Sequence, residues 1–333
     1  DLGGYLIELN KAYAFAEQTY FTLQSDPSAD AYSIDNPEHA SEGMVRYLSE
    51  LFEELYTAVA NGGVPAQGGT GWDDYFDMDS LLPYYWVNEW SRNFDAWRYS
   101  STYFTLPAQS RTFRMGPVWD FDLALYARVT EDGTLEGPIG LMAMKTKTSL
   151  DYRLLHIPAF QDLAMRYYLD VFEPVISQIL LGDANTAGET LHSLTWYWEE
   201  EATSRRMNDV LWNPVLLVFG RVSAPTYEEN YDLLRSFIRK RTAWLAEEVT
   251  HWSNPVKLET ANLTLTANFA NTEDTLRAVV QGGDQDKLIV KQSYSLAKEA
   301  TETEFALCRV DIALSAEIGY AFADDFALFI NGA

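Results

Sequence analysis

The chain is poor in cysteine, histidine and basic residues, and each shortage excludes a class of site or partner. Cys308 is the only cysteine among 333 residues, which excludes an intrachain disulfide framework and a multi-cysteine metal site. The four histidines are far apart and form no ligand pair, which argues against a zinc site and a histidine-based triad. Neither the phosphate-binding motif G-x-x-x-x-G-K-[ST] nor the dinucleotide motif G-x-G-x-x-G occurs.

Basic residues are outnumbered, with 24 Lys and Arg against 49 Asp and Glu, for a formal net charge of −25. Nucleic acids and anionic membrane surfaces bind clustered Lys and Arg, so neither suits this chain as a partner. No apolar run approaches the roughly 18 residues of a membrane span. We therefore expect no nucleic-acid partner and no membrane insertion, while the oligomeric state stays open.

The chain does contain 47% hydrophobic residues, enough for a substantial core. Apolar residues recur at helical spacing through most of the first 252 positions, with a few strand-like segments between the helices. The expected helices are 41–61, about 79–93, about 160–179 with a kink at Pro174, about 187–207, and one that begins with a capping box at Thr226. The expected strands are 3–10, 99–106 and 111–125, and residues 24–42 are expected to form a loop.

The spacing of apolar residues changes from helical to alternating after Pro255. Short alternating strands at regular intervals are typical of a small antiparallel sandwich. We therefore predict two domains, a mainly helical one at 1–252 and a small all-β, Ig-like sandwich at 256–333. The fold class expected for the whole chain is α+β.

The stretch from Met115 to Leu125 carries two carboxylates in an apolar setting. Its pattern predicts a buried strand, in which a period of two places Asp120 and Asp122 on the same face. Two buried like charges require a cation, strong donors or a shared proton, and a metal ion with oxygen ligands is the simplest compensation. The alternative is a strand with one solvated face and two aspartates that have no function.

A second polar group, Asn93-x-Asp95, precedes the strand expected before this stretch. If consecutive strands pair, Asp95 lies near Asp120 and Asp122. Phosphoryl transfer needs one carboxylate beside the attacking hydroxyl and others that hold magnesium, and kinases place them in this order along the chain. Paired carboxylates also suit a glycosidase, in which tryptophans could hold the sugar rings.

Several segments together resemble the CotH family of atypical, spore-coat-type protein kinases. They include Gly3-Gly-Tyr-Leu-Ile-Glu-Leu9, Tyr75-Phe-Asp-Met-Asp-Ser80, Glu89-Trp-Ser-Arg-Asn-Phe-Asp95, Ser101-Thr-Tyr-Phe104, Gly116-Pro-Val-Trp-Asp-Phe-Asp-Leu-Ala124 and Arg235-Ser-Phe-Ile-Arg-Lys-Arg-Thr-Ala-Trp-Leu245. The resemblance covers about residues 1–252, and the variants nearest to this chain belong to surface or secreted proteins of Gram-positive bacteria.

The resemblance implies a mainly helical kinase-like large lobe with a small β-hairpin or sheet. It also implies phosphorylation of Ser or Thr on a secreted or cell-surface protein, with ATP and Mg²⁺ as cofactors. Asp95 would be the catalytic aspartate, and Asp120 the magnesium ligand that plays the part of the kinase DFG aspartate. Asp122 would support the metal site, and Asn93 and Glu8 would contribute to the cofactor site.

The chain departs from the family's pattern at two positions. Ser100 lies five residues after Asp95, where the family often has an asparagine as a second metal ligand, and Tyr126 replaces the glycine that usually follows WDxD. The chain also begins at Asp1, in a strand-like segment and without a methionine. We therefore expect a fragment, preceded in the full-length protein by the part of the small lobe that carries the nucleotide-clamping lysine. Activity would then belong to the full-length molecule.

Two other functions stay open. A non-catalytic CotH-like module would use its acidic, aromatic surface to bind a cell-wall or surface partner, with the β domain as a spacer. A carbohydrate-active protein would use the paired carboxylates. The kinase interpretation places the protein outside the cell or at its surface, with the cytoplasm or the spore as the alternative location.

Overall fold

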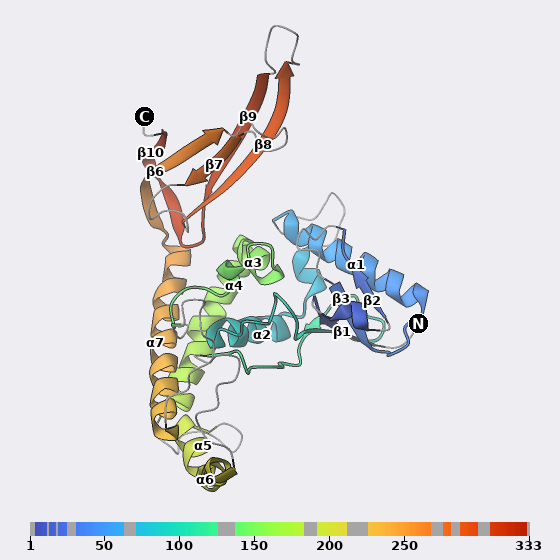
Figure 1. Cartoon of the computed structure of the whole chain (residues 1–333), viewed down its shortest axis with the longest axis vertical. Helices are drawn as coiled ribbons and strands as arrows, with labels where there is room; N and C mark the ends of the chain where they lie inside the picture. Colours follow the sequence, from blue (N-terminus) through green and yellow to red (C-terminus); the bar gives the residue numbers. More distant parts are fainter. Residues whose placement is uncertain are drawn as a thin grey trace. The chain divides into compact units, whose positions relative to one another are not determined.

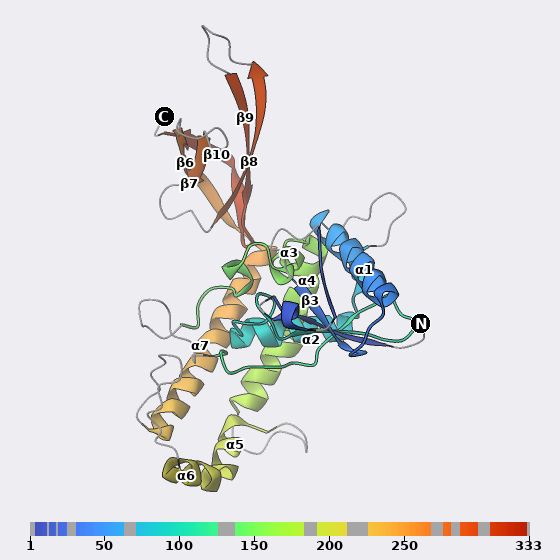
Figure 2. The same cartoon turned by 45° about the vertical axis from the view of Figure 1, so that its right-hand side comes forward.

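The computed structural model describes residues 4–11, 13–17, 19–24, 31–62, 71–125, 137–182, 192–211, 226–267, 276–280, 287–298 and 307–331. The chain divides into two compact units, residues 1–247 and 248–333, which are described separately here (Figures 1 and 2). Helices and separate β-sheets both occur, which confirms the α+β class. Within the described ranges, no helix is both long and apolar enough to cross a membrane.

The first unit contains a five-stranded antiparallel sheet in the order β2-β3-β1-β4-β5. Strand β1 is central, and its residues Tyr5, Ile7 and Leu9 alternate toward the buried face. The pairing of β1 with β4 sets Glu8 opposite Tyr103. The strands are β1 (Tyr5–Leu9), β2 (Tyr20–Thr22), β3 (Ala31–Asn36), β4 (Thr102–Leu106) and β5 (Arg114–Met115).

Helix α1 (Glu42–Ala60) packs against this sheet and lies beside it in both views (Figures 1 and 2). The Ser41 side chain caps the helix by accepting a hydrogen bond from the Met44 N–H at 3.4 Å, as the sequence predicts. Phe52 is fully buried, and its ring lies 5.2 Å from Phe104 and 4.8 Å from Phe113 of the sheet side. The apolar stripe of α1 therefore supplies the aromatic core above the sheet.

Helix α2 (Met78–Ser91) is the most buried helix of the described part of the first unit. Trp86 on α2 is fully buried and donates to the Ala164 carbonyl at 2.8 Å, and Trp90 donates to the Thr242 hydroxyl at 3.0 Å. The other helical segments are η1 (Ala14–Ala16), η2 (Trp72–Tyr75), η3 (Ala143–Lys145), α3 (Leu150–Leu155), α4 (Pro158–Tyr167), the π-helical η4 (Tyr168–Phe172) and η5 (Val175–Leu180), α5 (Leu194–Glu200), α6 (Ala202–Leu211) and α7 (Tyr227–Ser253).

Buried arginines tie residues 137–143 to α2. Arg241 on α7 pairs with Glu89 on α2 at 2.6 Å and also donates to the Gly140 carbonyl at 2.8 Å. The Glu89 carboxylate in turn accepts the backbone N–H groups of Met142 at 2.7 Å and Ala143 at 3.0 Å. Because most of these bonds go to backbone atoms, they fix the path of the chain whatever its side chains.

The second unit consists of strands. Its described strands form a three-stranded sheet in the order β10-β6-β7 and a two-stranded sheet of β8 and β9. The core contains Leu258, Leu263, Val280 and Leu288. The strands are β6 (Val256–Ala267), β7 (Leu276–Val280), β8 (Leu288–Lys298), β9 (Leu307–Ala316) and β10 (Tyr320–Ile330).

Four secondary-structure predictions need correction. Residues 31–36 form β3 instead of loop, because this strand is held between β1 and β2 whatever its turn-forming neighbours. Strands β6 and β10 pair in parallel, although antiparallel sheets were expected, since alternation reports a buried face and no strand direction. The helix expected at 187–207 consists of α5 and α6 with a break at Glu201, and its residues 187–191 lie outside the described ranges. Pro174 lies between two π-helical turns.

Candidate functional site

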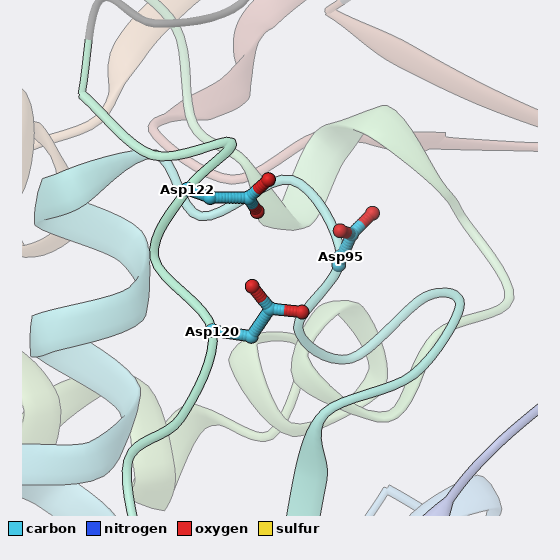
Figure 3. A group of neighbouring side chains, drawn as sticks. All are labelled: Asp95, Asp120 and Asp122. Carbon is cyan, nitrogen blue, oxygen red and sulfur yellow. The ribbon is translucent and has the colours of Figure 1, made fainter. Parts of the chain in front are cut away.

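Three aspartates from two segments meet beside the C-terminal end of α2. Asp95 follows that helix on a short loop, and Asp120 and Asp122 follow β5 on another (Figure 3). Their carboxylates face one another, and each offers an oxygen that lies within 4.8 Å of the others (Figure 3). Asp95 is partly buried, and the other two are exposed. Among the described residues, this is the group of acidic side chains whose spacing suits a metal ion.

The donor set fits a hard divalent cation. Such ions take carboxylate oxygens at about 2.1 Å for Mg²⁺ and about 2.3–2.6 Å for Ca²⁺, so two oxygens on opposite sides of one ion are about 4–5 Å apart. The separation of up to 4.8 Å allows three ligands to one ion after a small movement. Water would complete the coordination, as Mg²⁺ usually keeps several waters.

Asn93 lies directly behind the group. It is 1% exposed, and its amide donates to the Asp120 carbonyl at 3.2 Å and to the Asn88 side chain at 3.1 Å. In the part of the chain that the structure describes, its Oδ1 is buried without a hydrogen-bond partner. A buried amide oxygen without a partner is uncommon and calls for an explanation, such as a bound water or ion. This oxygen is the second observation that points to a ligand here.

Glu8 reaches the group through Ser101. The Glu8 carboxylate accepts the Ser101 backbone N–H at 2.9 Å, and the Ser101 hydroxyl lies 3.4 Å from Asp120 Oδ2. The Tyr84 hydroxyl on α2 donates to the Ser101 carbonyl at 3.3 Å. Ser101 therefore joins the central strand β1, helix α2 and the Asp120 loop at one point.

The backbone around the group adopts a conformation that side chains other than glycine rarely take. Five residues between α2 and the end of the Asp120 loop have left-handed φ angles: Arg92 at 55°, Trp97 at 68°, Ser101 at 60°, Asp120 at 59° and Leu125 at 58°. Each such residue costs about 1 kcal/mol or more and persists where the surrounding structure holds it. Their concentration around one carboxylate group supports a functional site.

Burial and like charge disfavour ionisation at this site. Burial raises the pKa of Asp120 above its usual range, and the neighbouring Asp122 raises it further. Burial likewise raises the pKa of Glu8, while the Ser101 N–H opposes that shift and Asp35 adds to it. A cation between the carboxylates would remove the repulsion that raises the pKa of Asp120.

The prediction of a buried strand at 115–125 is wrong. Strand β5 ends at Met115, and the following residues form turns in which the side chains of Val118 and Trp119 are 51% and 61% exposed. A residue with left-handed φ cannot continue a strand, and Asp120 has that conformation. The turn nevertheless brings Asp120 and Asp122 to the same carboxylate group that a strand would have formed.

The structure brings Asp95, Asp120, Asp122 and Asn93 together, and it links Glu8 to them through Ser101. Their functional roles remain predictions. Ser100 lies next to this linkage, with its hydroxyl 3.3 Å from that of Ser101. Tyr126 lies outside the described residues.

Sequence reasoning overlooked Ser101 and Asn88. Ser101 acts through its backbone and a single hydroxyl, and its left-handed φ has no signature in a serine. Asn88 is buried on α2, five residues before Asn93, and its side-chain oxygen orients the Asn93 amide. A buried asparagine in the last turn of an apolar helix was the one signal available, because such residues need partners.

The comparison with protein families agrees with this geometry. A family model described as CotH kinase protein matches residues 1–245. The match includes every residue of the carboxylate group and the segments that hold it. No curated protein and no solved structure matches the chain.

Proposed function

The chain belongs to the CotH family of kinase proteins, and from this premise we propose that it is an atypical protein kinase. It would transfer the terminal phosphoryl group of ATP, with Mg²⁺, to Ser or Thr of a secreted or cell-surface protein. The observation that carries the proposal is the meeting of Asp95, Asp120 and Asp122 within 4.8 Å. Phosphoryl transfer depends on such a placement of carboxylates more than on covalent chemistry.

Each residue of the group has a separate task in this proposal. Asp95 orients the acceptor hydroxyl and accepts its proton as the oxygen attacks phosphorus. Asp120 and Asp122 hold the metal, and Asn93 keeps the Asp120 loop in place through the Asp120 carbonyl. Magnesium, when bound, would neutralise phosphate charge and position the transferred group.

The surroundings make the metal indispensable to this chemistry. A pocket of about 310 Å³ beside β1 and β3 is lined by the carboxylates of Glu8, Glu17, Asp35 and Glu38. Phosphate oxygens near these groups would be repelled unless cations lie between them. Glu8 therefore fits a supporting role, in which it holds Ser101 or a cation, better than direct contact with a phosphate.

We also place the protein outside the cell or at its surface, with a Gram-positive bacterial source, and the kinase acting on a protein partner there. Residues 256–333 would form a small Ig-like sandwich that separates the kinase unit from its surroundings. The described strands of two sheets around Leu258 and Leu263 support this arrangement.

The test is calorimetric titration of the intact protein with Mn²⁺ and with Mg·ATP, together with transfer of radiolabelled phosphate. Asp120→Asn should weaken both kinds of binding, because it removes a charge that holds the metal. Asp95→Asn should leave nucleotide binding largely intact and lower turnover by about 10² or more, the usual scale for a positioned base. Asp324→Asn, which changes an exposed aspartate of β10, is the matched control and should change neither.

The second candidate is a non-catalytic relative that binds a surface partner. It is favoured by Ser100, since a serine at this position lacks the amide oxygen of the asparagine ligand common in the family. Absence of Mg·ATP binding and of self-phosphorylation in the intact protein would decide for this candidate. A carbohydrate-active function has no comparable observation in its favour.

A further inference from the structure

An open apolar groove lies next to the carboxylate group. It has a volume of about 460 Å³ and runs between α2, the segment after β5 and the π-helical turns η4 and η5. Three valines from two of these walls, Val118, Val171 and Val175, are 51%, 44% and 37% exposed. Large apolar side chains exposed together, along a concave surface, mark a binding site more often than chance does.

The polar atoms along the groove are already used within the protein. The Ser80 hydroxyl accepts the Met115 N–H at 3.0 Å and donates to the Asp77 carbonyl at 2.8 Å. The Gly116 N–H donates to the Tyr103 carbonyl at 2.9 Å. What the groove offers a ligand is therefore apolar surface. A purine would leave its ring nitrogens and amino group without partners, whereas an aliphatic side chain has no such groups.

The groove is continuous with the proposed catalytic group. Val118 in its wall is two residues from Asp120, a span of at most about 7 Å along the chain. Tyr84 also lines the groove, and its hydroxyl reaches Ser101, whose own hydroxyl lies 3.4 Å from Asp120. A polypeptide whose serine or threonine approaches Asp95 would pass this wall with its neighbouring residues.

We propose that this groove, resting on the kinase function above, binds a large aliphatic or aromatic side chain of the protein substrate. The side chain lies two or three residues from the phosphorylated Ser or Thr, because an extended chain covers the span from Val118 to Asp120 in that number of residues. The groove then selects substrates by hydrophobic burial, and the carboxylate group supplies the chemistry. Its substrate class is a polypeptide with an apolar residue close to the acceptor.

The test uses fluorescein-labelled ten-residue peptides of Ala and Gly with one Ser and one Leu placed up to four residues before or after it. Binding to the intact protein is measured by fluorescence anisotropy, with Mn²⁺ present. Peptides with Leu two or three residues from Ser should bind about 10-fold more tightly than the all-Ala version, the scale expected for one buried apolar side chain. Mn²⁺ should broaden the NMR signals of their serine protons.

Val118→Ser and Val175→Ser should each reduce the preference for Leu, and together abolish it. Val279→Ser, at an equally exposed valine (44%) of β7, is the matched control and should leave it unchanged. Equal thermal unfolding of the variants shows that they fold.

The possible outcomes separate the groove from the kinase function. No preference for Leu, with Mn²⁺ and Mg·ATP binding intact, overturns the groove and leaves the kinase proposal standing. Val118→Ser weakening Mg·ATP instead of peptide binding also overturns it, with a nucleotide base as the occupant. Groove-dependent binding of Leu peptides without any Mn²⁺ or Mg·ATP binding supports the groove as a peptide site and overturns the kinase function.

Discussion

The first unit holds two groups of acidic side chains that its structure treats in opposite ways. Glu89 and Asp151 are buried and face guanidinium groups, with Arg241 at 2.6 Å and Arg98 at 2.8 Å. The carboxylates of Asp95, Asp120 and Asp122 face one another. The first group completes a network inside the protein, whereas the second has a composition that a ligand must complete.

The energetic signs of the two groups differ for the same reason. Burial lowers the pKa of Arg241 to about 10, although Glu89 opposes the shift, so desolvation outweighs the charge partner. Such a pair is expensive to break, because either partner alone is an uncompensated buried charge. In the triad, removal of one carboxylate relieves repulsion instead of exposing it. A structural and a functional cluster of carboxylates can therefore be distinguished by mutation.

The largest effect is expected at the buried pair. Arg241→Ala should lower the free energy of unfolding by about 3–5 kcal/mol, because Glu89 is left buried without its cation and the 137–143 segment loses its anchors. Arg166→Ala removes an exposed pair with Asp162 on α4 and should cost about 0.5 kcal/mol or less. Urea denaturation of both variants measures the difference. Equal losses at the two sites would break the comparison.

A smaller effect of opposite sign is expected in the triad. Asp120→Asn should stabilise the metal-free protein by ~0.5 kcal/mol at neutral pH, since a like charge near Asp122 is removed and the site is largely solvent-exposed. Asparagine also tolerates the left-handed φ at this position. Thermal unfolding with excess Mn²⁺ should reverse the order of the two proteins, because a ligand stabilises the form that binds it. An unchanged order with Mn²⁺ would exclude a metal site.

The smallest effect concerns Glu8 and sharpens the position of this residue between the two groups. Its pKa is raised in the folded protein from a usual value of 4.5, chiefly by burial. Folding is therefore favoured below that value, and stability is lost as the pH rises through the raised pKa. Glu8→Gln keeps an acceptor for the Ser101 N–H and removes the charge, so Tm at pH 7 should rise by about 1 °C. The gain should disappear near pH 4.

Differential scanning calorimetry at both pH values tests this. Glu50→Gln on α1, at another glutamate of the same unit, serves as control and should give no pH-dependent gain. A loss of stability for Glu8→Gln at pH 7 would mean that the charge of Glu8 stabilises the fold, as it does at Glu89.

Local sequence signals predicted the elements whose stability is local. The Ser41 cap and the apolar stripe of α1 set that helix within one residue of its observed start. The capping box of Thr226 and Glu229 is present, with the Glu229 N–H donating to the Thr226 hydroxyl at 3.2 Å. The same signals did not separate a strand from a turn at 115–125, because an apolar run with two aspartates suits either.

The sequence by itself determined the α+β class, the family, and the three aspartates of the candidate site. Only the tertiary structure decided how they meet. The Glu89–Arg241 pair joins residues 152 positions apart, and Glu8 reaches Ser101 across 93 positions, so no local pattern encodes either contact. The left-handed angles at Ser101 and Asp120 are likewise imposed by the packing around them, since neither residue type prefers that conformation strongly enough to adopt it alone.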